Sequence, residues 1–354
     1  MVIFSHDFLL HRDPAGIHPE RPERLIIAIK SVKEDKSLQG LIELQESPQA
    51  DYSIPYLVHN SEYVEYIKSE SSKGFHYIDF DTYVNEFTFD VATKALTASY
   101  LAGELSLNTS SHVLVLPRPP GHHVGRNGKA MKALSNGFCI FNNSAAAVKF
   151  FTERGFKVLV VDFDAHHGNG TQEIFWYDDA VVHIDIHESG IFPGTGNIHD
   201  IGGEGAEGTK INIPLPPFSG DDVYVWIASK LVPSIVKAFK PSALVISAGF
   251  DAHVKDPLTT LNVEGDAYIA FGALVRRLLH HRLIRGAVTV LEGGYGEGLR
   301  RGLPLYVHAV SLGLREELKP VSNKELYARY GKLLRNINEV IGRYWGIDFL
   351  GQHS

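Results

Sequence analysis

The stretch KVLVVDFDAHHGNGTQ, residues 157–172, runs from an apolar segment directly into a group of polar side chains. The run VLVV is apolar on successive residues, as expected for a parallel strand that is covered on both faces. Because side chains alternate along a strand, Asp162, Asp164 and His166 project to the same side. Two carboxylates and an imidazole are unfavourable together in an apolar interior unless a cation lies between them. The stretch therefore predicts a buried parallel strand with a cation site at its end.

Strand-like and helix-like segments alternate along the rest of the chain. Short apolar, β-branched runs predict strands, and amphipathic segments between many of them predict helices. The predicted strands are residues 2–4, 112–116, 157–163, 181–186, 210–215, 243–249 and 287–294. The predicted helices are residues 20–34, 88–106, 142–154, 221–239, 264–282, 296–313 and about 322–343. This rhythm predicts an α/β fold with a mostly parallel sheet, and because no Pro-, Ser- or Gly-rich linker interrupts it, a single domain over residues 1–354.

Composition argues against several classes of protein. The 354 residues carry a formal net charge of −7, which leaves no basic imprint for direct nucleic-acid binding. The single cysteine, Cys139, excludes an intrachain disulfide and a cysteine-rich zinc module. No apolar run approaches the roughly 18 residues of a membrane span, and the first residues lack a signal-peptide pattern. We therefore expect a cytoplasmic protein without membrane contact.

A second predicted strand also ends in a ligand-type residue. ALVISAGFDAH, residues 243–253, leads through a glycine to Asp251. Since ligands in open parallel sheets gather beyond the carboxyl ends of the strands, Asp164, His166 and Asp251 form a plausible three-ligand metal set. Zinc is the preferred metal, although the oxygen-rich set also suits Fe²⁺, Co²⁺ or Mn²⁺. The alternative is an Asp- and Asn-rich turn whose carboxylates bind local backbone groups.

Two further motifs follow predicted strands. LPRPPGHHVG, residues 116–125, contains adjacent histidines at His122 and His123, which suit metal binding, acid–base chemistry or simple exposure. LEGGYG, residues 291–296, places Tyr295 after two glycines. Such a tyrosine either donates a hydrogen bond to developing negative charge or packs as an ordinary aromatic.

In their order along the chain, these motifs resemble those of the histone deacetylase and acetylpolyamine amidohydrolase family, within the arginase–deacetylase superfamily. The resemblance rests on HPERPER (18–24), RPPGHH (118–123), GFCIFNN (137–143), DFDAHHGNGTQ (162–172), FPGTGN (192–197), SAGFDAH (247–253) and EGGYG (292–296). The motif sequences DFDAHHGNGTQ and EGGYG are more similar to those of class II-like bacterial and archaeal members than to those of class I enzymes. The resemblance implies one open α/β domain with a mainly parallel eight-stranded sheet between helices, and zinc-dependent removal of an acyl group from an amine.

The resemblance also implies roles for single residues. Asp164, His166 and Asp251 are implied as the zinc ligands. His123 is implied as the general base and later acid, with His122 as its electrostatic partner.

Three more residues complete the implied catalytic set. Asp162 would orient His122, and Asn169 would partner His123 where class I enzymes have aspartate. Tyr295 would bind the substrate carbonyl opposite the zinc ion.

Substrate-binding roles follow by the same resemblance. Phe138 and Phe192 would wall the tunnel for the acyl-amine, and the Gly137 carbonyl would accept the substrate amide N–H. Asp81 would grip the substrate backbone at the rim. Arg24 matches the arginine beside the internal acetate-release passage.

A monovalent cation such as K⁺ is also implied. Backbone oxygens around Asp162, Asp164 and His166, together with Asp185, would hold it.

Three functions stay open on the sequence: a deacetylase of acetyl-lysine in proteins or peptides, a deacetylase of acetylpolyamines or related small amides, and a catalytically weak protein that binds acylated ligands. The intact ligand set and Tyr295 argue against the third.

Overall fold

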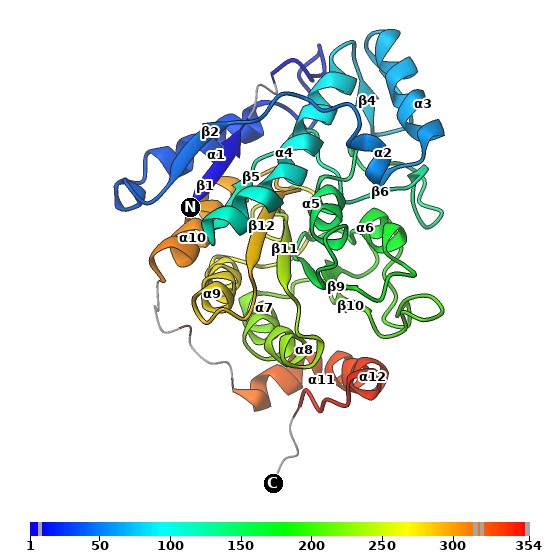
Figure 1. Cartoon of the computed structure of the whole chain (residues 1–354). Helices are drawn as coiled ribbons and strands as arrows, with labels where there is room; N and C mark the ends of the chain where they lie inside the picture. The colour runs from blue at the N-terminus through cyan, green and yellow to red at the C-terminus, as the bar shows by residue number, and fades with distance from the viewer. Residues whose placement is uncertain (6–8, 314–317, 319–321, 351–354) are drawn as a thin grey trace.

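Eight parallel strands form the central sheet of the structure, a computed structural model that describes residues 1–5, 9–313, 318 and 322–350 (Figure 1). Their order across the sheet is β10–β9–β8–β11–β12–β5–β1–β2, and every neighbouring pair is parallel. The strands are β1 (Val2–Ser5), β2 (Glu43–Glu46), β5 (His112–Val115), β8 (Val158–Asp162), β9 (Val181–Glu188), β10 (Lys210–Leu215), β11 (Ala243–Ala248) and β12 (Gly286–Leu291). The expected α/β fold with a parallel eight-stranded sheet is confirmed.

An apolar core lies on each face of the sheet. Along β8, Val158 and Val160 belong to one core, whereas Leu159 and Val161 belong to the other. All five residues of β8 are buried, as are all residues of β9, β11 and β12. Burial on both faces is the reason that these strands are apolar on successive residues.

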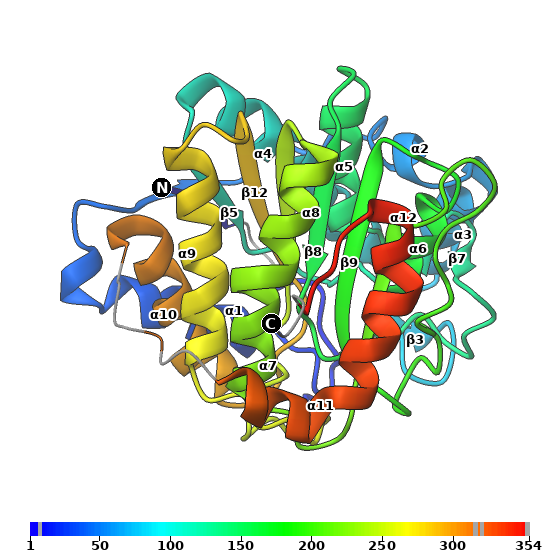
Figure 2. The ribbon, with the colours of Figure 1, turned by 90° about the horizontal axis from the view of Figure 1, so that it is seen from below.

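Helices cover both faces. The core that contains Val158 is covered by α2 (Pro55–Val58), α3 (Ser61–Ser72), α4 (Thr88–Thr109), α5 (Asn143–Thr152) and α6 (Asn169–Ile174). The opposite core is covered by α1 (Glu23–Lys33), α7 (Asp221–Trp226), α8 (Val232–Phe239), α9 (Asp266–His280), α10 (Gly298–Leu312) and α11 (Asn323–Ile337), with the short α12 (Arg343–Trp345) at the end. Figure 2 shows α8, α9 and α11 lying over this second face.

The structure departs from the sequence prediction at a few elements. Strand β2 was not predicted, because its sequence ELQE has no apolar run; as the edge strand it pairs only with β1, so none of its side chains is buried. The single helix predicted over 221–239 is divided by the π-helical segment Ile227–Leu231. Helices α2 and α3 and the short α12 were not predicted either. Nor were a 3₁₀ turn (Lys36–Leu38) and two hairpins, β3 (His76–Tyr77) with β4 (Tyr83–Val84), and β6 (Val124–Gly125) with β7 (Gly128–Lys129). A second π-helical segment (Asn338–Gly342) lies within the helix predicted over about 322–343.

The carboxyl ends of three central strands lie side by side. Ser247 of β11 is in register with Asp162 of β8, and Ala248 of β11 is in register with Leu291 of β12. Residues that follow these strands therefore meet at one edge of the sheet, where ligands of open parallel sheets bind.

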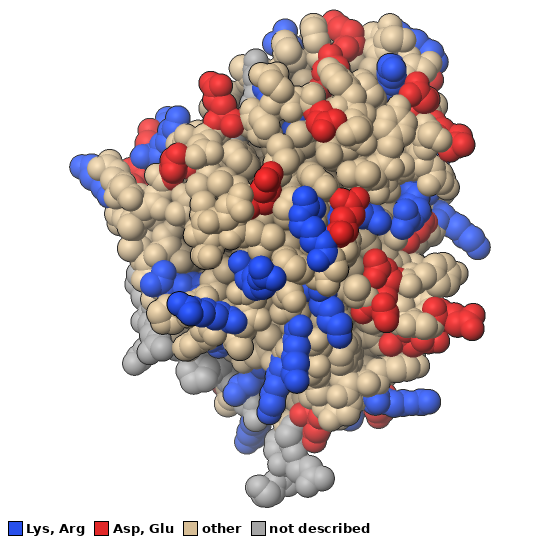
Figure 3. Space-filling model, in the orientation of Figure 1, with Lys and Arg blue, Asp and Glu red and all other residues tan. Residues whose placement is uncertain are grey.

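The opposite edge carries exposed basic residues. Lys157, Lys240 and Arg285 lie just before β8, β11 and β12, and backbone hydrogen bonds join the first and third loops to Ser242 of the middle one. Figure 3 shows basic side chains spread over this side of the molecule, among fewer acidic ones. In the described part of the chain, no helix is both long and apolar enough to cross a membrane.

Candidate active site

Two carboxylates and one imidazole converge beyond the ends of β8 and β11. Nδ1 of His166 lies 3.2 Å from Oδ1 of Asp164 and 3.0 Å from Oδ2 of Asp251. The three ligand atoms lie within 4.8 Å of one another. Both aspartates are buried, and His166 is partly exposed. The structure thus brings together the three residues that the sequence predicts as metal ligands, and the imidazole among them is in part accessible to solvent.

The charges of this cluster suit a cation. Burial and then the neighbouring carboxylate of Asp164 raise the pKa of Asp251. Burial opposes protonation of His166, but its hydrogen bonds to Asp164 and Asp251 raise its pKa to about 10. The two buried carboxylates therefore stabilise a positive charge on the imidazole between them. A divalent ion would supply that charge, and two oxygen donors with one nitrogen donor form a set that zinc, Fe²⁺ or Co²⁺ accepts.

A glycine on β12's loop lets the backbone approach this cluster closely. The N–H of Gly293 donates to Oδ2 of Asp164 over 2.7 Å. A Cβ atom at Gly293 would overlap the carboxylates of both Asp164 and Asp251. The absence of a side chain at this position therefore lets the loop before Tyr295 lie directly against the predicted ligands.

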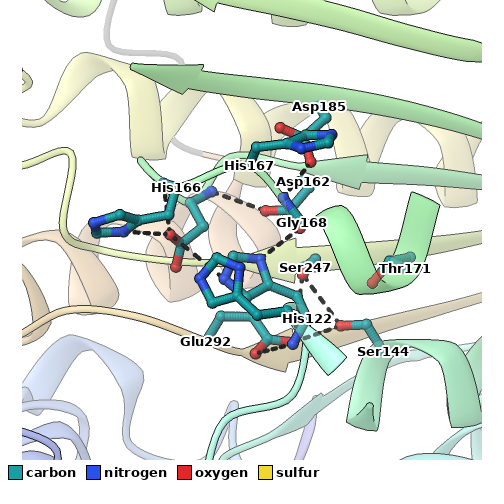
Figure 4. A network of polar contacts seen from close by, with 12 residues as sticks. His122, Ser144, Asp162, His166, His167, Gly168, Thr171, Asp185, Ser247 and Glu292 are labelled. Atoms are coloured by element: carbon teal, nitrogen blue, oxygen red, sulfur yellow. Dashed lines mark hydrogen bonds and ion pairs between the residues drawn. The ribbon is translucent and has the colours of Figure 1, made fainter. Parts of the chain in front are cut away.

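His122 and His123 lie beside the cluster and bind different partners. Nδ1 of His122 is 3.0 Å from Oδ2 of Asp162, and Nδ1 of His123 is 2.9 Å from Oδ1 of Asn169 (Figure 4 shows the first pair). Because the Asn169 amide nitrogen donates to the carbonyl of Ala130, the Asn169 oxygen faces the histidine. Nδ1 of His123 must then carry the proton, and its unprotonated ring atom is Nε2.

The two rings have opposite charge preferences. Burial opposes protonation of His122, but the carboxylates of Asp164 and Asp162 outweigh it and raise the pKa of His122 well above its usual range. Burial, followed by the charges of His122 and His166, lowers the pKa of His123 well below its usual range. The pair therefore consists of one imidazolium and one neutral imidazole that can accept a proton.

Tyr295 stands among aromatic and cationic neighbours. Its ring makes an edge contact with Phe138 at 5.5 Å between centroids, and the Arg24 guanidinium carbon lies 4.5 Å from the Tyr295 ring centre. Arg24 also donates to the carbonyls of Gly294 and Glu292, over 2.8 and 2.5 Å. Arg24 thereby holds the loop that carries Tyr295.

Phe192 and Gly137 lie on the His123 side of the site. The Phe192 ring makes an edge contact with His123 at 4.9 Å between centroids. Gly137 has a φ of +55°, and a Cβ there would lie 2.6 Å from both His123 and Phe192. Phe138 and Phe192 are both partly exposed, as two walls of an opening require.

The other predicted residues occupy more varied places. The carboxylate of Asp81 accepts hydrogen bonds from the Ser135 and Thr82 hydroxyls, at 2.7 and 3.0 Å, so it ties down the loop that precedes Gly137. A rim role in substrate binding stays a prediction for Asp81.

The predicted monovalent-cation residues fall into two groups. Asp162 and Asp185 lie together with His183, a buried residue that the sequence did not suggest, whereas the side chains of Asp164 and His166 belong to the first cluster. Asp185 also accepts the N–H of Gly168 over 2.9 Å. A K⁺ site that uses backbone oxygens here stays a prediction.

Sequence reasoning missed Glu292. Its buried carboxylate accepts the N–H of Gly121 and of His122, at 2.8 and 3.2 Å, and the hydroxyl of Ser144 at 2.8 Å (Figure 4). Glu292 therefore fixes the backbone of the histidine pair. A sequence signal for it was present, because a charged residue follows the apolar strand β12 directly, much as Asp162 ends the apolar strand β8.

Comparisons with known proteins identify the relatives of this chain. The sequence profile of the histone deacetylase domain matches residues 18–309. The chain is 38% identical over 352 residues to an uncharacterized protein of Methanocaldococcus jannaschii, with 98% of each chain covered. It is 36% identical over 297 residues to a probable deacetylase of Archaeoglobus fulgidus, covering 83% of this chain and 80% of that one. A crystal structure of the HDA15 HD domain matches with a TM-score of 0.84 and 30% identity, covering 99% of this chain and 98% of that one.

Fold and relatives together define a hydrolase with the deacetylase architecture. The chain belongs to the histone deacetylase family, because the profile covers most of its length and the relatives match over most of theirs. Membership supports deacetylase activity for this chain.

Proposed function

We propose that the chain is a zinc-dependent deacetylase that removes the acetyl group from acetyl-lysine in peptides or proteins, working as one catalytic domain. The observation that carries the proposal is the position of the His123 imidazole, whose Nδ1 is paired with Asn169 and whose ring centre lies 6.1 Å from that of His166 in the Asp164–His166–Asp251 cluster. A hydrolase of this kind needs both a cation to activate the carbonyl and a base to take a proton from water.

The ion would be held by Asp164, His166 and Asp251. Zinc, or Fe²⁺ or Co²⁺ in its place, supplies a Lewis acid that polarises the acetyl carbonyl and lowers the pKa of water. Side chains of the protein carry out the proton transfers and stabilise the developing charge. His123 accepts the proton of the attacking water at Nε2, while Asn169 keeps Nδ1 protonated.

The remaining steps use Tyr295 and the other histidine. The Tyr295 hydroxyl donates a hydrogen bond to the carbonyl oxygen as negative charge develops there. His122 stays cationic through its pairing with Asp162, so it stabilises that negative charge. His123 then gives the proton that it took from water to the leaving amine. Acetate and a free amine result.

The proposed substrate follows from the two partly exposed aromatic rings, Phe138 beside Tyr295 and Phe192 beside His123. Phe138 and Phe192 would pack against the apolar stem of an acetylated side chain, since aromatic rings bury a large apolar area. The Gly137 carbonyl would accept the amide N–H, and Asp81 would bind the substrate backbone. Arg24 would lie beside the departing acetate.

Metal-depleted protein, restored separately with Zn²⁺, Fe²⁺ and Co²⁺, tests this function. We expect acetate release from an acetyl-lysine peptide to require metal, with a kcat/KM above that for acetylated putrescine or spermidine. Higher kcat/KM on the polyamines would identify a small-amide deacetylase instead. Turnover without metal, or ligand binding without turnover under any metal, would contradict the proposed hydrolase.

A further inference from the structure

The loop that carries Tyr295 leaves β12 through two glycines, Gly293 and Gly294. Gly294 has a φ of +121°, a conformation that residues with side chains rarely adopt. Glycines give a backbone several alternative paths of similar energy. The place of the Tyr295 hydroxyl therefore depends on what holds the loop beyond the glycines.

A buried carboxylate, Asp256, holds the loop there. Oδ2 of Asp256 accepts the N–H of Tyr295 over 2.7 Å and the N–H of Gly296 over 3.0 Å. Its other oxygen accepts the N–H of Leu258 over 3.1 Å, which fixes the carboxylate in its own turn. The carboxylate thus accepts three backbone N–H groups, two of them from the loop that carries Tyr295.

The fit of the two loops supports the same contact. A Cβ atom at Gly296 would lie 3.0 Å from the Cα of Asp256 and would overlap the carbonyl oxygen of Lys255. The loop after Tyr295 is therefore packed directly on the backbone of residues 255–256, and the glycine is required for that approach. Asp256 itself is only 7% exposed, so water competes little for its oxygens.

We propose that Asp256 is a positioning residue for the deacetylation reaction, because it holds the backbone of Tyr295 so that the hydroxyl stays beside the Asp164–His166–Asp251 cluster. This inference rests on the proposed role of Tyr295. Without the carboxylate, the glycine loop populates other conformations, and only the fraction that presents the hydroxyl is competent.

A double-mutant cycle tests the proposal through non-additivity. Asp256→Ala should lower kcat about 10- to 100-fold with a smaller change in KM, because competent loop positions become scarce. In a Tyr295→Phe background, the same substitution should lower kcat less than about threefold, because the hydroxyl to be positioned is already gone. Asp256→Asn, whose amide oxygen still accepts N–H groups without the charge, should fall between wild type and Asp256→Ala, and it serves for the cycle if the alanine variant does not fold.

A matched control is available at Asp221. Its carboxylate also accepts three backbone N–H groups, those of Glu264, Gly265 and Ala267, but it does so at the start of α9. Asp221→Ala should lower the melting temperature and leave kcat within about twofold, because its effect is confined to folding.

Hydrogen exchange gives a readout that needs no turnover. Exchange of the Tyr295 and Gly296 amides, followed in a peptide covering 292–298, should accelerate at least about tenfold in Asp256→Ala. Unchanged exchange, or an equal loss of kcat in the wild-type and Tyr295→Phe backgrounds, would overturn the positioning role. Normal kcat in Tyr295→Phe alone would instead contradict the proposed function, and the exchange result would still decide whether Asp256 holds the loop.

Discussion

His122 and His123 are neighbours in the chain with ring centroids 4.0 Å apart, yet their surroundings give them different charges. The His122 ring binds the carboxylate of Asp162, whereas the His123 ring binds the amide of Asn169. Both rings are almost fully buried, so burial does not separate them. The difference lies in the partner atoms, because an anion stabilises an imidazolium and a neutral amide oxygen does so much less.

That difference in charge suits the two histidines to different roles in acid–base catalysis. A base must be unprotonated at the start of the reaction, and a stabiliser of negative charge must be protonated throughout. The proposed mechanism assigns these two roles to His122 and His123, because their partners, residues 162 at the end of β8 and 169 at the start of α6, differ by one functional group.

The largest expected effect comes from removing a predicted metal ligand. Asp251→Ala should lose most of its bound metal and most of its rate of acetate release. Both losses should exceed the roughly 10- to 100-fold that is typical when a residue hydrogen-bonded to a metal ligand is replaced, because here the ligand itself is removed. Elemental analysis and far-UV circular dichroism on the same sample measure occupancy and fold, with Asp221→Ala as the folding control. Full metal occupancy in folded Asp251→Ala would show that the ligands lie elsewhere.

The next effect tests His123 alone. His123→Ala should keep its metal and lose about 10²- to 10⁴-fold in kcat, the contribution of a positioned general base, with a smaller change in KM. Steady-state kinetics beside metal analysis measures both. Metal loss in this variant would make His123 a ligand and remove the contrast with His122.

A smaller effect is expected from a substitution that gives His123 the same kind of partner as His122, a carboxylate. In Asn169→Asp, a carboxylate replaces the amide beside His123, so the pKa of His123 should rise. Because the base must be unprotonated, the acid limb of kcat/KM should move to higher pH, with the plateau reduced far less than in His123→Ala. The pH profile measures this shift, and an unmoved acid limb would mean that His123 is not the titrating base.

Much of the fold could be predicted from sequence because buried parallel strands are apolar on successive residues. The runs around Val160 and Val245 satisfy this rule on both faces. Strand β2 does not, since an edge strand needs no apolar run, and the π-helical segment Ile227–Leu231 changes the hydrogen bonding of a helix without changing its composition.

The site was predictable where the chemistry needs a particular side chain at a strand end. Asp164, His166 and Asp251 follow that rule, and the structure places them together. Asp256 does not, because it acts on backbone N–H groups, which carry no sequence signal of their own. His183 was also missed, since its place beside Asp162 comes from the register of β8 and β9.

The measurement that tests the central claim most directly is the kcat of Tyr295→Phe on an acetyl-lysine peptide. Phenylalanine keeps the ring and its packing on Phe138 and removes only the oxygen that is proposed to stabilise the transition state. The account predicts that the variant keeps its fold, its zinc and most of its affinity for the acetylated ligand, while kcat falls by roughly 10²- to 10³-fold. A variant with near-normal kcat would contradict the account and leave Tyr295 as a packing residue.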